Sequence, residues 1–190
     1  MTRRTRSAPN ASKGVAGWSL GAALLFALAG CDLPQGMQSG ALPEHIHQIE
    51  IPEFANETAV VQVQSDLTQL VRRKVTEDGR LLIAAPGTGP QARLSGTIVR
   101  YALEPIEKDS GTGRVSRWRL RIDMRLVLTD LVNGKELWRE PTNAMQLPFD
   151  AFYEFFDMGN RQGKTPETEE QARSKVADLL AAKVVARLFR

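Results

Sequence analysis

Residues 117–129 carry the pattern that constrains the fold most, an alternation of apolar and charged side chains that is unbroken from Arg117 to Leu126. The apolar positions are Trp118, Leu120, Ile122, Met124, Leu126 and Leu128, and the charged positions are Arg117, Arg119, Arg121, Asp123 and Arg125. Successive side chains of a β-strand point to opposite faces, so this pattern predicts a long strand with one buried and one basic face. Such a strand belongs in a sheet that is covered on one side.

The Asn-Gly pair that ends at Gly134 predicts a hairpin after this strand. A two-residue loop would pair Leu128 with Arg139 and place apolar and charged side chains on the same face. A three-residue loop, residues 132–134, would pair Leu128 with Trp138 and put Gly134 in the left-handed conformation of a bulge. The match of faces favours the three-residue loop.

The other segments predict two helices and further strands. Alternating or short apolar runs predict strands at 46–51, 81–84, 92–103 and 136–146, and Pro105 is expected to end the third. Apolar residues at helical spacing predict helices at 59–78, with Gly79 as C-cap, and from 165–166 to the end. The order β-α-β-β-β-β-α predicts an α+β two-layer sandwich, with two helices packed on one face of a mixed four- to five-stranded sheet.

Aromatic residues gather in 149–156, which holds five of the ten aromatic residues that follow position 30. Phe149, Phe152, Tyr153 and Phe156 are spaced i, i+3, i+4 and i+7, which predicts one face of a short helix. The segment either closes the core or anchors an interface, because aromatic side chains are enriched in both.

The first thirty residues predict an export signal. A basic stretch, 1–14, precedes an apolar run, 15–30, that is short for a bilayer span. The run ends in Leu-Ala-Gly-Cys, which resembles the lipobox of bacterial lipoproteins and implies cleavage before Cys31 and a covalent lipid on its sulfur. The alternative is an ordinary signal peptide and a buried thiol at Cys31. We therefore expect a signal peptide at 1–30, a flexible tether at 31–43 and a single domain at 44–190.

The composition argues against several classes of function. Four of the 25 basic residues lie in the signal, which leaves 21 against 22 acidic residues, so general nucleic-acid binding is not expected. The chain lacks nucleophile-elbow, P-loop and dinucleotide motifs, so we expect no enzyme and no cofactor beyond the lipid on Cys31. His45 and His47 could chelate a metal, but no further ligand is suitably spaced.

Three stretches resemble the LptE family of lipopolysaccharide-assembly lipoproteins. They are I-E-I-P-E-F-A-N-E-T at 49–58, A-R-L-S-G-T-I-V-R-Y at 92–101, and L-T-D followed by G-K-E-L-W at 128–138. The resemblance implies two helices on a mixed sheet. It also implies a domain that plugs an LptD β-barrel on the periplasmic side of the outer membrane, supports barrel assembly and assists lipopolysaccharide transport. The implied partners are the barrel, lipopolysaccharide and, through the lipid anchor, the membrane.

Two questions stay open at this stage. The basic face at Arg117, Arg119, Arg121 and Arg125 is our candidate for contact with lipid A phosphates or barrel-wall acids, but these arginines could instead pair with acids such as Glu136 or Glu140. The first motif also resembles LpoB- and CsgG-type lipoproteins, which regulate cell-wall synthesis or form secretion pores. Asp32 resembles the inner-membrane retention signal of enteric lipoproteins, which leaves the choice of membrane open.

Overall fold

Two long strands form the centre of the sheet. β4 (Ala92–Lys108) and β5 (Val115–Asp130) pair antiparallel over almost their whole length. The structure, a computed structural model, describes residues 42–85, 87–141, 148–157 and 165–190, which all belong to the unit Ser39–Arg190. The predicted inner face of β5 is confirmed, because its apolar side chains from Leu120 to Leu128 are 0% exposed.

The other edge of β5 pairs with two strands in succession. β7 (Phe149–Phe156) lies antiparallel to residues 117–124 of β5, and β6 (Lys135–Glu140) lies antiparallel to residues 126–130. The segment that the aromatic spacing predicted as a helix is therefore a strand. A period of two also fits its sequence, and the free edge of β5 decides between the two patterns.

The turn between β5 and β6 differs in one detail from the prediction. Leu128 faces Trp138 as predicted, and Gly134 has a left-handed φ of 65°. The loop has four residues rather than three, because Asp130 pairs with Lys135, and a register shift after Leu128 restores the predicted pair. The Asp130 carboxylate accepts hydrogen bonds from the main-chain N–H groups of the two residues after Leu131, which closes the turn one residue early.

Parallel strands complete the mixed sheet on the other side of β4. β1 (Gln48–Glu50) and β2 (Ala55–Asn56) pair with β4, and β3 (Leu82–Ile83) pairs with β1. The principal strand order is β3-β1-β4-β5-β6, and seven strands of the described residues take part. This exceeds the predicted four to five because β2 is too short to show a pattern and the aromatic spacing in β7 predicts a helix. In the predicted strand at 81–84, Leu81 is buried and Leu82 is 64% exposed, so the apolar run there is only partly buried.

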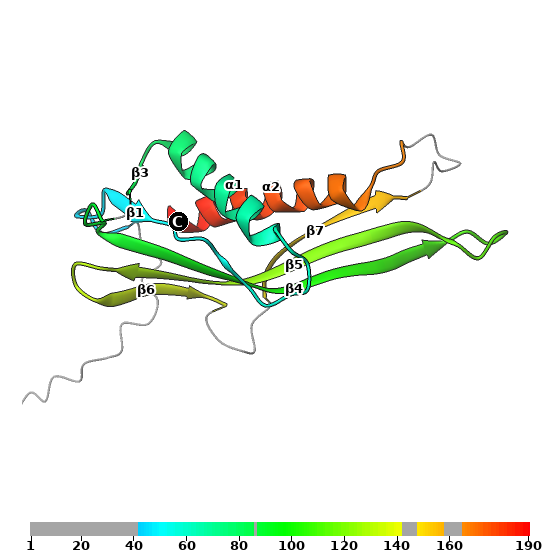
Figure 1. Cartoon of the computed structure of the whole chain (residues 1–190), viewed down its shortest axis with the longest axis horizontal. Coiled ribbons are helices and arrows are strands. Elements are labelled where there is room, and N and C mark those ends of the chain that lie inside the picture. Colours follow the sequence, from blue (N-terminus) through cyan, green and yellow to red (C-terminus); the bar gives the residue numbers. More distant parts are fainter. Residues whose placement is uncertain (1–41, 86, 142–147, 158–164) are drawn as a thin grey trace, which may run out of the picture. The chain divides into compact units, whose positions relative to one another are not determined.

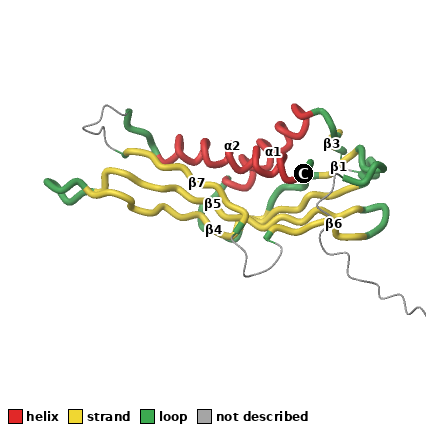
Figure 2. The backbone as a smooth tube through the Cα atoms, turned by 180° about the vertical axis from the view of Figure 1, so that it is seen from behind, coloured by secondary structure: helices red, strands yellow, loops and turns green. Residues whose placement is uncertain are grey.

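Both helices cover the same face of this sheet (Figures 1 and 2). α1 (Val63–Asp78) ends at Gly79, whose φ of 77° confirms the predicted cap, and α2 (Glu169–Leu188) begins after Thr168. The Thr168 hydroxyl accepts from the main-chain N–H of Gln171, and the Gln171 side chain accepts from that of Thr168. The predicted helices start about a turn too early, because the turn at Asn56 and the cap at Thr168 delay them.

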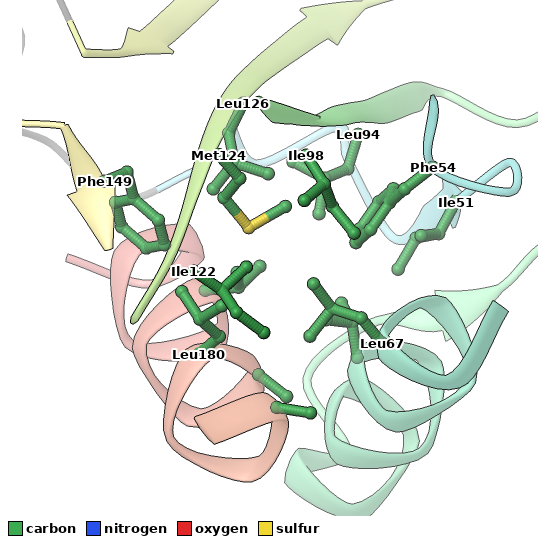
Figure 3. Packing of buried hydrophobic residues seen from close by; sticks show 14 of the residues in the cluster. Ile51, Phe54, Leu67, Leu94, Ile98, Ile122, Met124, Leu126, Phe149 and Leu180 are labelled. Carbon is green, nitrogen blue, oxygen red and sulfur yellow. The ribbon is translucent and has the colours of Figure 1, made fainter. Parts of the chain in front are cut away.

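The hydrophobic core lies between the helices and the sheet. Figure 3 shows Leu67 of α1 and Leu180 of α2 beside Ile98 of β4 and Ile122 and Met124 of β5. All five side chains are 0% exposed. The predicted fold class, an α+β sandwich of two helices on one mixed sheet, is confirmed.

β4 does not end at Pro105 as predicted but continues to Lys108. Beyond Arg100 it pairs with β5 on one edge, and no strand among the described residues pairs with its other edge. Proline lacks an N–H group, so it fits an edge strand that donates no hydrogen bond there.

The expected signal peptide, Cys31 and all of the tether except Leu42 and Pro43 lie outside the described residues. Within the part of the chain that the structure describes, no helix is long and apolar enough to cross a bilayer.

Candidate functional site: the outer face of the sheet

The candidate site lies on the face of the sheet that points away from the helices. Arg117, Arg119, Arg121 and Arg125 of β5 occupy this face, because they alternate with the buried positions of that strand. Residues of β7 lie opposite the first three, with Arg119 facing Glu154 and Arg121 facing Phe152, whereas Arg125 lies beyond the end of β7 and faces Thr97 of β4. The structure therefore brings three of the four predicted arginines together with half of the predicted aromatic residues.

Glu154 of β7 binds two of the arginines. Arg119 donates to its Oε1 from Nη2 at 2.5 Å and from Nε at 3.1 Å. Arg117 Nη1 lies 3.5 Å from Oε2 of the same carboxylate, and Arg117 Nε lies 3.4 Å from Glu107 of β4. One acid thus holds both arginines across the strand pair.

Arg121 lies between two aspartates. Its Nε donates to Asp123 at 2.8 Å, and its Nη2 lies 3.0 Å from Asp150 of β7. The hydrogen bond to Asp123 raises the pKa of the Arg121 guanidinium. Asp123 is itself buried, so this arginine balances a carboxylate that would otherwise be costly to bury.

Arg125 is the most accessible of the four arginines. It forms a short hydrogen bond to Glu57, which lies just beyond β2. Both side chains of this pair are 53% exposed, whereas Arg117, Arg119 and Arg121 are between 27% and 35% exposed. Exposed ion pairs stabilise proteins by about 0–1 kcal/mol, so this pair opens most easily for another anion.

The strand conformation of β7 splits the predicted aromatic face into two. Phe149 and Tyr153 lie over the core on the helix side, together with Phe155 (4% exposed), which is not part of the predicted helical face. Phe152 and Phe156 lie on the outer face. Arg119 stacks over Phe152, with its guanidinium carbon 4.9 Å from the ring centre, and Arg117 lies 6.0 Å from that of Phe156.

The charges on this face largely cancel. Each of the four predicted arginines contacts a carboxylate within the described residues. The acids named from the sequence were wrong, because Glu136 binds Arg139 and Glu140 binds Arg187. The acids of β7 that do pair with the predicted arginines, Asp150 and Glu154, share one parity with Phe152 in the sequence. If 149–156 is a strand, this parity places both acids on the same face as the arginines. A phosphate on this face must compete with carboxylates already in place.

The residues of the first two motifs stabilise the fold through packing and turn formation. Phe54 covers Gly96, where an added Cβ would lie 2.7 Å from the Phe54 ring. The Asn56 side chain accepts from the N–H and hydroxyl of Thr58 and donates to the main chain of Val60, which forms the turn before α1. These residues therefore identify the fold rather than a binding surface.

The third motif and Tyr101 have similar roles. Asp130 closes the β5–β6 turn, Trp138 lies under the guanidinium of Arg187, and Tyr101 donates to Glu169 at the start of α2. Burial, followed by the hydrogen bond to Glu169, raises the pKa of Tyr101.

A metal site is not formed by the histidines. His45 Nε2 lies 2.9 Å from Oδ2 of Asp130, and His47 is exposed. Among the described residues, no group of three or more histidine, cysteine or acidic side chains could hold a metal ion.

Several solved structures are similar to this chain at low sequence identity. PelC from Paraburkholderia phytofirmans has a TM-score of 0.47 and 17% identity, over 80% of this chain and 94% of that one. The hypothetical protein CT253 from Chlamydia trachomatis has a TM-score of 0.49 and 8% identity, over 75% and 95%. Lipoprotein GNA1162 from Neisseria meningitidis has a TM-score of 0.43 and 14% identity, over 74% and 96%. Likenesses of this size say nothing about what the chain does.

No curated protein matches the sequence. The family model described as LptE, lipopolysaccharide-assembly, matches residues 46–188, which include every helix and strand described above. The three stretches that resemble this family, at 49–58, 92–101 and 128–138, lie inside the matched range. Their residues form turns and packing contacts of the fold. The chain therefore belongs to the LptE family of lipopolysaccharide-assembly proteins.

Proposed function

We propose that the mature chain starts at a lipidated Cys31 and is anchored on the periplasmic side of the outer membrane. In this proposal, residues 44–190 plug the lumen of an LptD β-barrel, support assembly of that barrel and assist lipopolysaccharide transport. Family membership supports the role in lipopolysaccharide assembly, and the lipobox-like sequence before Cys31 supports the anchor. Two or three acyl chains hold a protein stably on a membrane.

The balanced charge of the outer face is the observation that carries the plug proposal. The interior wall of an outer-membrane barrel is polar, so a plug needs a polar surface. Enclosing a surface in a lumen removes water from it, and an unpaired charge is then costly. The pairs of Arg119 with Glu154 and of Arg121 with Asp123 and Asp150 suit a surface that is enclosed without losing charge balance.

Direct contact with lipopolysaccharide is a second part of the proposal. An arginine guanidinium can hold a phosphate with two parallel hydrogen bonds. We propose Arg125 as the first contact, because its partner Glu57 is exposed and can move away. Arg117, Arg119 and Arg121 would join only if the phosphate displaces Glu154 or Asp150.

The barrel partner can be tested by co-purification. A tag at the C-terminus, extraction in mild detergent and mass spectrometry identify what accompanies the lipidated chain. We expect a heat-modifiable β-barrel at near-equal stoichiometry in the outer-membrane fraction. A photo-crosslinker in place of Phe152 or Arg125 should label that barrel. Recovery from the inner membrane, with a penicillin-binding protein or with copies of this chain alone, would contradict the proposal.

The lipopolysaccharide contact can be tested by charge reversal. Arg125→Glu and the double variant Arg119→Glu/Arg121→Glu should weaken lipopolysaccharide binding more than they lower the unfolding temperature. Arg73→Glu is the matched control, because Arg73 is an exposed arginine paired with Glu77 on the helix side. If binding is unchanged in the first two variants, the outer face does not contact lipopolysaccharide.

A further inference from the structure

The chain enters the domain at one end of the sheet. Leu42, the first described residue, packs against the hydrophobic core. Nε2 of His45 lies 2.9 Å from Oδ2 of Asp130, the last residue of β5. The main-chain N–H of Leu82 in β3 donates to the carbonyl of His47 at 2.9 Å. The start of the domain therefore contacts both β3 and the end of β5, and Figures 1 and 2 show β1, β3 and the β5–β6 turn at the same end of the sheet.

Two exposed apolar side chains border this entry point. Leu82 is 64% exposed and Val132, in the β5–β6 turn, is 63% exposed. The main-chain N–H of Val132 donates to the carboxylate of Asp130, which His45 also contacts. On the described surface, the one large apolar side chain that is more exposed is Val61, at 76%. Two of the three most exposed large apolar residues thus lie where the chain enters the domain.

Few charges lie near these two side chains. The sequence from 81 to 92, LLIAAPGTGPQA, has no charged residue, although 25% of the whole chain is charged. Of the charged neighbours, Arg80 and Glu136 are each held in an ion pair, and Glu44 and Lys135 carry opposite charges. Exposed apolar side chains on a surface of this kind are typical of contact with a membrane or a protein. We name the surface formed by 42–47, Leu82 and 131–135 the entry end.

The length of chain before the domain decides which surface can cover the entry end. Leu42 comes eleven residues after Cys31. An extended chain spans at most about 3.3–3.6 Å per residue, so this stretch reaches about 40 Å at most. β4 (17 residues) runs from the entry end towards the tip of the β4–β5 hairpin and spans about 55 Å. A lipid on Cys31 therefore keeps the entry end close to the membrane, whereas the hairpin tip can lie beyond the reach of the tether.

The tether makes a small contact effective. A short flexible linker raises the effective concentration of a second contact to about the millimolar range. Burying a leucine and a valine side chain removes apolar surface from water, which is favourable. Because the charges of the entry end nearly cancel, lipid headgroups do not repel it. A lipid surface thus matches the entry end both in chemistry and in distance from the anchor.

We propose that the entry end contacts the surface of the membrane that carries the lipid on Cys31, with Leu82 and Val132 inserted among the lipid headgroups. The contact fixes which end of the domain stays at the membrane surface. This inference rests on the proposed lipidation of Cys31 and does not depend on the barrel partner.

The test places one spin label at a time on the lipidated chain in vesicles of phosphatidylethanolamine and phosphatidylglycerol. Leu82→Cys and Val132→Cys probe the entry end, and Val61→Cys and Thr112→Cys are exposed controls. Electron paramagnetic resonance compares how often each label collides with oxygen, which partitions into membranes, and with a nickel chelate, which stays in water. The ratio of oxygen to nickel collisions should be higher by about threefold or more at 82 and 132 than at the controls. Equal ratios, or low accessibility to both reagents as in a protein interface, would overturn the proposal.

Val61 is the matched control for Val132. It is an exposed valine that precedes α1, and the 16 residues of this helix separate it from Arg80 by about 24 Å. Thr112 lies at the tip of the β4–β5 hairpin, at the far end of the long strands.

Labelling of the parent chain separates this proposal from the proposed lipidation. Cys31 is the only cysteine of the chain, so a lipid on its sulfur leaves the parent without a thiol to label. A parent chain that takes up the label would show that Cys31 is free, which removes the anchor and overturns both proposals. A parent that stays unlabelled, together with water-exposed labels at 82 and 132, overturns the membrane contact alone.

Charge variants test whether the apolar side chains hold the contact. Leu82→Asp should lower the collision ratio of a label at 132 by about threefold, because a charged group is costly to remove from water. Val61→Asp should leave that ratio unchanged. Both substituted positions are exposed, so both variants should keep the unfolding temperature of the parent. If Leu82→Asp leaves the label at 132 as shielded from nickel as before, Leu82 does not take part and the proposal is wrong.

Discussion

Gly96 shows at the scale of one residue why a motif position admits no side chain. An added Cβ would lie 2.7 Å from Cδ1 of Phe54, a ring that is 2% exposed and cannot swing into solvent. Gly96→Ala should therefore destabilise the protein by about 1–3 kcal/mol, as overpacked cores do. Urea unfolding measures the change. Gly111→Ala, at the exposed tip of the β4–β5 hairpin, should be nearly neutral. Phe54→Leu should recover part of the loss in the double variant, and additive losses would contradict direct contact.

Asp130 makes the stability of the fold depend on pH. Burial raises its pKa, but hydrogen bonds from Asn133 and Val132 outweigh this effect and hold the pKa below its usual range. A carboxyl with a lowered pKa stabilises the folded state above its unfolded pKa of about 3.9, and this contribution disappears as the pH falls through the folded value.

Removing the charge of Asp130 should reduce that dependence. Asp130→Asn should lower the free energy of unfolding at pH 7 by about 1–2 kcal/mol, because charged acceptors make the stronger hydrogen bonds. The difference from the parent should shrink towards pH 3 in urea titrations. A constant difference across this pH range would exclude Asp130 as the titrating group.

The N-terminus of α2 is stabilised by one capping box. Thr168 and Gln171 exchange hydrogen bonds between side chain and main chain, and Glu169 and Glu170 lie in the first turn. Thr168→Ala should cost about 1 kcal/mol in thermal or urea unfolding. Thr76→Ala, at an exposed threonine on α1, should cost less, since its hydroxyl bonds only to Arg72 within the helix. Equal losses would show that the cap does not fix where α2 begins.

Elements with a long pattern could be predicted from the sequence, and short or ambiguous ones could not. The alternation along β5 and the helical stripe of α1 with Gly79 located these elements within a few residues. The prediction for 149–156 was wrong because its aromatic residues fit both the helical period of 3.6 and the strand period of two. Pairing with β5 selects the strand. Once β7 is taken as a strand, Glu154 falls opposite Arg119, so the error in the element hid the charge balance of the candidate site.

Lipidation should decide where the protein is found in the cell. Cys31→Ala removes the sulfur that the lipobox-like sequence offers for modification. We expect the variant to lose the mass of the lipid in intact mass spectrometry and to lose its co-purification with the barrel. The domain at 44–190 should keep its unfolding temperature, because all of its described helices and strands come after Cys31 in the sequence. An unmodified parent chain would contradict the anchor.

The separation of strand partners along the chain also sets an order of folding. β4 and β5 are joined by a turn of a few residues, whereas the partners Ile49 and Ala92 lie on either side of α1. Closing a long loop costs more entropy than closing a short one, so the hairpin is expected to form before β1 and β2 reach it. Substitutions in the hairpin should then slow folding, and substitutions at Ile49 should mainly speed unfolding. We therefore expect the N-terminal strands β1 and β2 to join a sheet whose central hairpin already exists.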